Sequence, residues 1–101
     1  MSTTVSINTQ ALQELCKEFQ VKELYLFGSA ATGKLSDNSD LDFIVQFDRH
    51  GYEGAFDQFL DFKYRLEEIY QRPVDLYHQR TFRNAIFQEE VDRSKKLLYA
   101  A

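Results

Sequence analysis

Three carboxylates and one pair of small residues are spaced in a way that suits phosphate chemistry. Asp40 and Asp42 open a segment of alternating apolar and polar residues, and Asp75 lies in a later, shorter apolar segment. Gly28 and Ser29 end another apolar run, with ten residues between them and Asp40. Side chains at positions i and i+2 of a strand point to the same face, so Asp40 and Asp42 can share a metal site.

The chemistry of such a group follows from its charges. If the strand with Asp75 lies beside the strand with Asp42, the carboxylates converge and repel one another unless a cation lies among them. Mg²⁺ prefers a few carboxylates together with water and substrate phosphates, and two such ions can clamp an in-line displacement at phosphorus. Gly28 lets a phosphate approach the backbone, and Ser29 can donate hydrogen bonds to it at a helix start. The stretch therefore predicts a site for a nucleoside triphosphate and its metals.

The same residues resemble the signature of a known superfamily. Gly28-Ser29, a ten-residue gap and Asp40-Leu41-Asp42 match the polymerase-β-like nucleotidyltransferases, and the chain is similar to their smallest branch, the minimal nucleotidyltransferase (MNT, MntA-like antitoxin) domain. The resemblance implies that Asp40, Asp42 and Asp75 are catalytic and bind two Mg²⁺ ions, with Asp75 helping to deprotonate the attacking hydroxyl. It also implies that Gly28 and Ser29 hold the β- and γ-phosphates of ATP.

The resemblance further implies an activity and a partner. An acceptor hydroxyl would attack the α-phosphorus of ATP, and pyrophosphate would leave. In this branch the domain is often the antitoxin of a toxin–antitoxin pair, and it neutralises a helical HEPN ribonuclease by binding it and by transferring AMP to a tyrosine of the toxin. The expected function is therefore an Mg²⁺-dependent protein adenylyltransferase.

One departure from the family pattern leaves two alternatives open. Many relatives carry a basic residue where this chain has Ala30 or Thr32, so Lys34 is the nearest cation and the expected third nucleotide-binding residue. Because pyrophosphate departure needs charge neutralisation, one alternative is a weakly catalytic or non-catalytic antitoxin that occludes its partner. The other is transfer to a small molecule of the aminoglycoside type, for which a second subunit would have to supply the substrate site.

Two rival motifs fail within the same stretch. Gly28, Gly33 and Lys34 fit the spacing of a phosphate-binding P-loop, but Leu35 stands where Ser or Thr would bind Mg²⁺. Alternating acids also resemble the start of a calcium-binding EF-hand loop, but Phe43 stands where that loop needs glycine.

The elements that would position these residues follow from hydrophobic periodicity and capping signals. Helices and strands alternate, which predicts an α/β (α+β) fold of the polymerase-β-like type, with a small mixed sheet and helices packed mainly on one face. We expect one domain over residues 1–101. The expected elements are a helix over Gln10–Gln20 capped by Thr9, strands over Val21–Phe27 and Asp40–Asp48, a helix over Ala55–Gln71, a strand over Val74–His78, a helix over Phe82–Arg93 capped by Thr81, and an edge strand over Lys96–Tyr99.

Composition narrows the class of protein. Hydrophobic residues make up 44% of the 101 residues, which is enough for a core. The net charge of -4 and the absence of a basic stripe disfavour nucleic acid as the main partner. The sequence shows neither a membrane-spanning apolar run nor a secretory signal, so a cytoplasmic protein is expected, and its oligomeric state is left open. Cys16 falls in an apolar helical stripe and is predicted to be buried.

Overall fold

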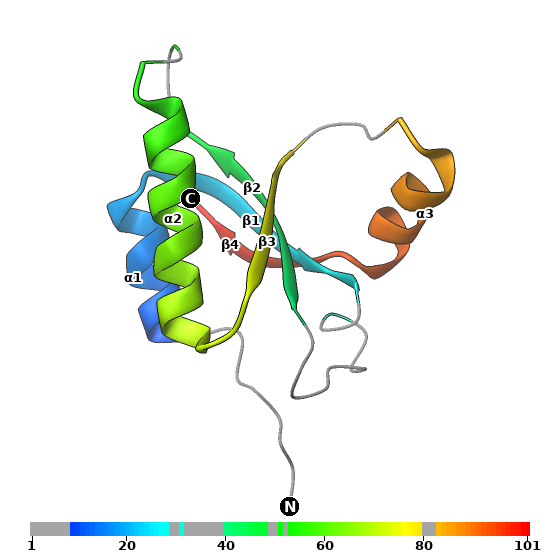
Figure 1. Cartoon of the computed structure of the whole chain (residues 1–101), viewed down its shortest axis with the longest axis horizontal. Coiled ribbons are helices and arrows are strands. Elements are labelled where there is room, and N and C mark those ends of the chain that lie inside the picture. Colours follow the sequence, from blue (N-terminus) through cyan, green and yellow to red (C-terminus); the bar gives the residue numbers. More distant parts are fainter. Residues whose placement is uncertain (1–8, 29–30, 32–39, 49–50, 52, 80–82) are drawn as a thin grey trace, which may run out of the picture.

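A computed structural model of the chain describes residues 9–28, 31, 40–48, 51, 53–79 and 83–101. Its sheet has the strand order β3-β2-β1-β4, in which β1 pairs antiparallel with β2 and β4, and β2 pairs parallel with β3 (Figure 1). The predicted mixed α+β architecture is confirmed. The elements are α1 (Gln10–Glu18), β1 (Val21–Phe27), β2 (Leu41–Phe47), α2 (Ala55–Tyr70), β3 (Val74–His78), α3 (Ala85–Ser94) and β4 (Lys96–Ala100).

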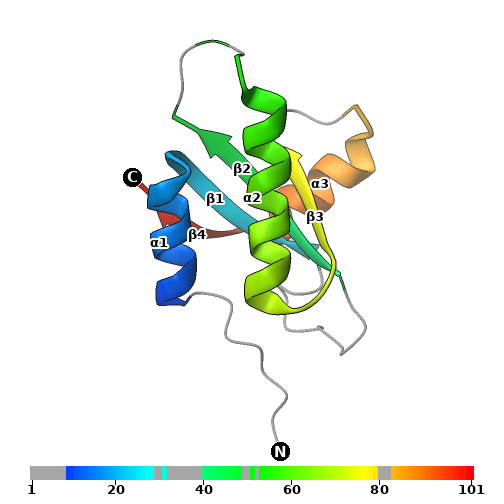
Figure 2. The ribbon, with the colours of Figure 1, turned by 60° about the vertical axis from the view of Figure 1, so that its left-hand side comes forward.

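The main core lies between the sheet and the two helices α1 and α2, which pack side by side (Figure 2). Phe43 and Val45 of β2 are fully buried there, as the alternation of that strand predicts. Phe62 of α2 is also fully buried, and its ring lies 5.5 Å from that of Phe19, which follows α1. This packing fixes which face of β2 is turned away from the core, and Asp42 is on that face.

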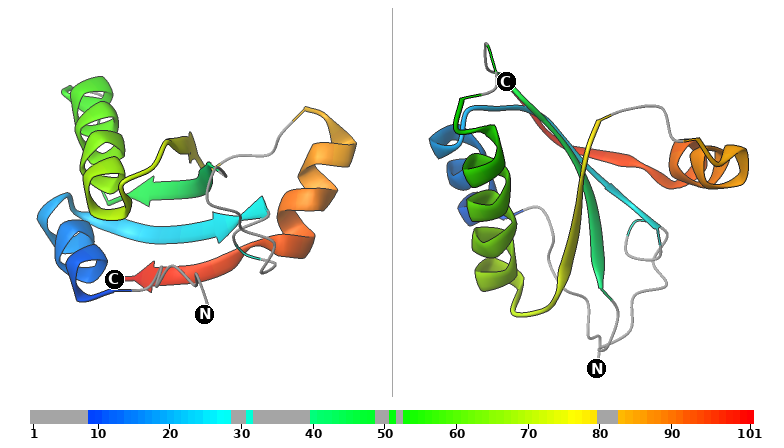
Figure 3. Two further views of the ribbon diagram at one scale, coloured as in Figure 1. Left: turned by 60° about the horizontal axis from the view of Figure 1, so that its bottom comes forward. Right: turned by 45° about the horizontal axis from the view of Figure 1, so that its top comes forward.

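The opposite face of the sheet is partly covered by α3 (Figure 3). A second apolar cluster forms there from Phe27, Ile44 and Val91, with Tyr77 and Phe87 packed around it. Ile44 is only 4% exposed, although it shares its face of β2 with Asp42. The sheet therefore has one face that packs against α1 and α2 and one face that α3 covers only in part, and the carboxylates lie on the second.

Most predicted boundaries agree with the structure to within two residues. Thr9 caps α1 as predicted, since its hydroxyl accepts a hydrogen bond from the Leu12 N–H at 3.1 Å. The prediction for the last helix is wrong at its start: α3 begins at Ala85, not at Phe82, and its N-cap is Asn84 rather than Thr81. The Asn84 side chain accepts hydrogen bonds from two backbone N–H groups, and asparagine is a stronger cap than threonine.

The structure also bears on the predictions for Cys16 and for membrane-spanning segments. Cys16 is fully buried, and burial raises the pKa of its thiol to about 12, so it is a core residue and not a reactive thiol. None of the helices that the structure describes is long and apolar enough to cross a membrane.

Candidate functional site

Asp42 and Asp75 lie side by side at the starts of two parallel strands. They are register partners across β2 and β3, so their side chains project from the same face of the sheet. The Leu41 N–H donates a hydrogen bond to the Pro73 carbonyl oxygen at 3.1 Å, which ties the two strand starts together. The sequence argument depended on β3 lying beside β2, and the structure places it there.

The charges of this group oppose one another. Asp42 is half-buried, whereas Asp40 and Asp75 are exposed. The pKa of Asp42 is raised from 3.8 to about 6, chiefly by burial and in addition by repulsion and hydrogen bonding from Asp75 and repulsion from Asp40. The metal-free site thus disfavours the charge of its central carboxylate, which is the electrostatic condition that a bound cation relieves.

Gly28 closes the site from the end of β1. Phe27 is the antiparallel partner of Asp42, so the next residue, Gly28, lies at the same edge of the sheet. Its φ angle is +76°, and a Cβ added to it would lie 2.8 Å from Oδ2 of Asp42. A side chain at this position would collide with the carboxylate, so glycine is required both by the backbone angle and by the close approach.

Ser94, the last residue of α3, holds Gly28 in place. The Gly28 N–H donates a hydrogen bond to the Ser94 hydroxyl at 3.0 Å, and that hydroxyl donates to the Glu90 carbonyl oxygen at 2.8 Å. Ser94 is 6% exposed. Sequence reasoning missed it, because nothing in the spacing of a serine at a helix end indicates a contact with a glycine far away in the chain.

We expect Ser94→Ala to lower the free energy of unfolding by about 0.5–1.5 kcal/mol, because it removes the hydrogen bond to Gly28. Urea denaturation of the two proteins measures the difference. Ser94→Thr keeps the hydroxyl and serves as the control, with a smaller loss expected. Equal unfolding midpoints for wild type and Ser94→Ala would contradict this role.

Glu67 of α2 is a second residue whose role sequence reasoning missed. Its carboxylate accepts a hydrogen bond from the Val74 N–H at 3.0 Å. It also pairs with Lys63 at 3.4 Å. Because Val74 precedes Asp75, Glu67 fixes the start of the strand that carries the second carboxylate.

The predicted ligand set can be compared with this geometry. Among the described residues, no three His, Cys, Asp or Glu side chains are grouped closely enough to form a ready-made metal site. Asp42 and Asp75 nevertheless offer the oxygen donors that Mg²⁺ prefers, and their mutual repulsion suits a cation. The joint binding of metal by Asp40, Asp42 and Asp75 stays a prediction. Ser29 and Lys34, and the positions of Ala30 and Thr32, lie outside the described residues.

Comparison with known proteins identifies the family. The family model described as a nucleotidyltransferase domain matches residues 9–98. The chain belongs to this nucleotidyltransferase family. Over 75 residues the nucleotidyltransferase is 32% identical to an inferred protein adenylyltransferase of Methanocaldococcus jannaschii, and the match covers 74% of either chain. The protein is therefore a nucleotidyltransferase, as its sequence signature predicts.

Solved structures share the fold of this nucleotidyltransferase. A toxin–antitoxin crystal structure with AMP-PNP superposes with a TM-score of 0.70 at 21% identity, covering 96% of this chain and 75% of the other. An inferred minimal nucleotidyltransferase superposes with a TM-score of 0.68 at 24% identity, covering 94% and 98%. An MNT antitoxin in complex with a tri-AMPylated HEPN toxin of Shewanella oneidensis gives a TM-score of 0.57 at 19% identity, covering 87% and 66%.

Proposed function

We propose that this nucleotidyltransferase is an Mg²⁺-dependent protein adenylyltransferase that acts as the antitoxin of a toxin–antitoxin pair. It would transfer AMP from ATP to a hydroxyl of a partner protein, specifically a tyrosine of a HEPN-type toxin. The observation that carries the proposal is the pairing of Asp42 with Asp75 directly beside Gly28. The adenylyltransferase relative and the fold shared with MNT antitoxins of HEPN toxins support the choice of reaction and partner.

Asp42, Asp75 and Gly28 would have different roles in this reaction. The attacking hydroxyl oxygen forms a bond to the α-phosphorus, the bond from that phosphorus to the bridging oxygen of the β-phosphate breaks, and pyrophosphate leaves. Asp75 is exposed on the open face, where its carboxylate can accept the proton of the hydroxyl. Gly28, without a side chain, leaves room for the phosphates beside Asp42. Asp42 and Asp75 would hold Mg²⁺, which when bound neutralises charge on the triphosphate and the leaving pyrophosphate.

The experiment is a transfer assay with labelled ATP, Mg²⁺ and the product of the neighbouring gene as acceptor. We expect label on a tyrosine of that partner, found by peptide mass spectrometry, and loss of labelling when Mg²⁺ is chelated. The double variant Asp40→Ala/Asp42→Ala should give no label. If wild type never attaches a nucleotide to this partner, the proposed transfer to it is wrong.

The second candidate function is neutralisation by occlusion without chemistry. It is favoured by Ala30 and Thr32, which stand where cations would assist the departure of pyrophosphate. The same double variant separates the two functions in a growth assay with co-expressed toxin. Catalytic neutralisation predicts that the variant fails to rescue growth, whereas occlusion predicts rescue equal to wild type.

A further inference from the structure

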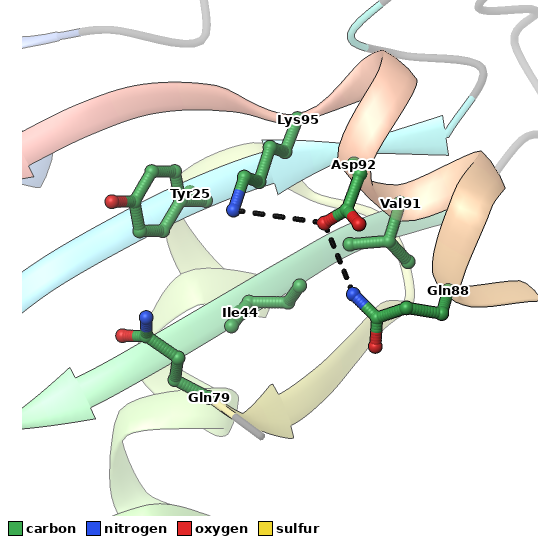
Figure 4. Close-up of a pocket in the computed structure, with 7 residues that line it drawn as sticks. All are labelled: Tyr25, Ile44, Gln79, Gln88, Val91, Asp92 and Lys95. Atoms are coloured by element: carbon green, nitrogen blue, oxygen red, sulfur yellow. Dashed lines mark hydrogen bonds and ion pairs between the residues drawn. The ribbon is translucent and has the colours of Figure 1, made fainter. Parts of the chain in front are cut away.

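A pocket of about 290 Å³ lies between α3 and the partly covered face of the sheet (Figure 4). Ile44 of β2 contributes to its floor, two residues along the strand from Asp42. At the usual rise of a strand, this separation is about 7 Å. Tyr25, the antiparallel partner of Ile44, lines the pocket next to it.

The site and the pocket are arranged in one line along the sheet. Gly28 follows the end of β1 and lies against Asp42, and Ile44 with the pocket lies farther along β2. If the β- and γ-phosphates lie at Gly28 and the α-phosphate at Asp42, an extended nucleotide directs its nucleoside toward the pocket. This step rests on the proposed function, because it needs a nucleoside triphosphate at the carboxylates.

The walls of the pocket combine apolar surface with a polar rim. Ile44 and Val91 are buried apolar residues at 4% and 2% exposure. The rim carries the side-chain amides of Gln79, which follows β3, and of Gln88 on α3 (Figure 4). A nucleobase is a flat ring that prefers apolar contact on its face, with hydrogen-bond donors and acceptors along its edge, and an amide offers both.

The polar rim is held in place by its own contacts. The Gln88 amide donates a hydrogen bond to Oδ1 of Asp92 at 3.0 Å, and the Lys95 ammonium lies 3.9 Å from the same oxygen (Figure 4). The Lys95 ammonium also lies 5.2 Å from the centre of the Tyr25 ring. These contacts orient the Gln88 side of the rim before any ligand enters, which lowers the entropy cost of binding.

We propose that this pocket is the subsite for the nucleobase of the nucleoside triphosphate, read by Gln79 and Gln88 at its rim. A tyrosine of the partner is the other aromatic group that could enter. The one polar atom of a tyrosine side chain is the reacting hydroxyl, which must point toward the α-phosphorus at Asp42. A tyrosine ring in the pocket would therefore offer no hydrogen-bond partner to the two glutamine amides. The mixed donor and acceptor rim therefore favours a nucleobase.

The test compares ATP with inorganic tripolyphosphate, which carries the phosphates without a nucleoside. Isothermal titration in Mg²⁺ measures both dissociation constants for wild type, Gln79→Leu, Gln88→Leu, the double variant of these two substitutions and the control Ile86→Ala. Ile86 is on α3 but 79% exposed and away from the pocket lining, so its variant keeps the helix and the charge. Circular dichroism and thermal melts verify that each variant is folded.

We expect wild type to bind ATP more tightly than tripolyphosphate. Each leucine variant should weaken ATP binding about three- to tenfold, and the double variant tenfold or more, with tripolyphosphate binding unchanged. The Ile86→Ala control should match wild type for both ligands. Unchanged ATP binding in the folded double variant overturns the subsite but leaves the proposed function standing. Failure of wild type to bind either ligand overturns both.

A second measurement does not depend on variants. Ultraviolet irradiation with an azido-substituted ATP attaches the base to the residues that surround it, and peptide mass spectrometry locates the label. We expect the label on Tyr25, Gln79 or Gln88. A label confined to α1 or α2, which pack on the other face of the sheet, would overturn the proposal.

Discussion

Asp42→Asn is expected to reduce nucleotide transfer at least about 100-fold while making the metal-free protein more stable. The loss of activity follows because an amide cannot replace a carboxylate as a ligand for Mg²⁺ next to the triphosphate. The gain in stability follows because the substitution removes a half-buried charge that Asp75 and Asp40 repel. The rise in the pKa of Asp42 from 3.8 to about 6, discounted for partial exposure, corresponds to about 1–2 kcal/mol in the free energy of unfolding.

The gain in stability should depend on pH in a defined direction. In the folded protein the pKa of Asp42 is about 6, whereas its ordinary pKa, which applies to the unfolded chain, is 3.8. The wild-type free energy of unfolding therefore falls as the pH rises from about 4 to 6, and the penalty is complete above that range. Thermal melts of wild type and Asp42→Asn should coincide near pH 4 and differ near pH 7, by roughly 4 °C or more.

Asp48→Asn is the matched control for this prediction. Asp48 follows the far end of β2 and is exposed, so the same chemical change there should leave both activity and stability near wild type. Retention of most transfer activity by Asp42→Asn would show that this carboxylate is not a metal ligand. Equal melting temperatures at pH 7 would show that the repulsion is absent.

Gly28→Ala is expected to lower stability by about 1–2 kcal/mol and to reduce transfer about 100-fold. The first effect follows from the φ angle of +76°, which a residue with a Cβ adopts at a cost. The second follows because the new methyl group would lie 2.8 Å from Oδ2 of Asp42, so the short carboxylate must move away. A displacement of about 1 Å in a reacting group is enough for such a loss.

Gly54→Ala separates these two effects. Gly54 has a φ angle of +72°, close to that of Gly28, but a Cβ added there meets no atom within 4 Å. Both variants should therefore lose a similar part of the free energy of unfolding, measured in urea, while only Gly28→Ala loses transfer. Equal activity of the two variants would show that the approach to Asp42 does not matter for catalysis.

Much of the fold followed from local patterns in the sequence. The alternation in β2 gave the correct inward set, including Phe43 and Val45, because one face of that strand must be buried. The start of α3 was predicted too early, because Thr81 and Asn84 are both capping residues and periodicity alone does not choose between them. The hydrogen bond of Glu67 could not be predicted, because its partner, Val74, belongs to another element.

The sequence by itself determined the family of this protein and the residue types of its candidate site, which are the glycine after β1 and the alternating carboxylates at the start of β2. These are local features, because side-chain alternation and backbone angles depend on neighbouring residues. Only the tertiary structure decided that Asp75 lies beside Asp42, that Ser94 holds Gly28, and that α3 leaves a pocket over Ile44. Strand pairing and helix docking join residues far apart in the chain, and no spacing within a single segment encodes them.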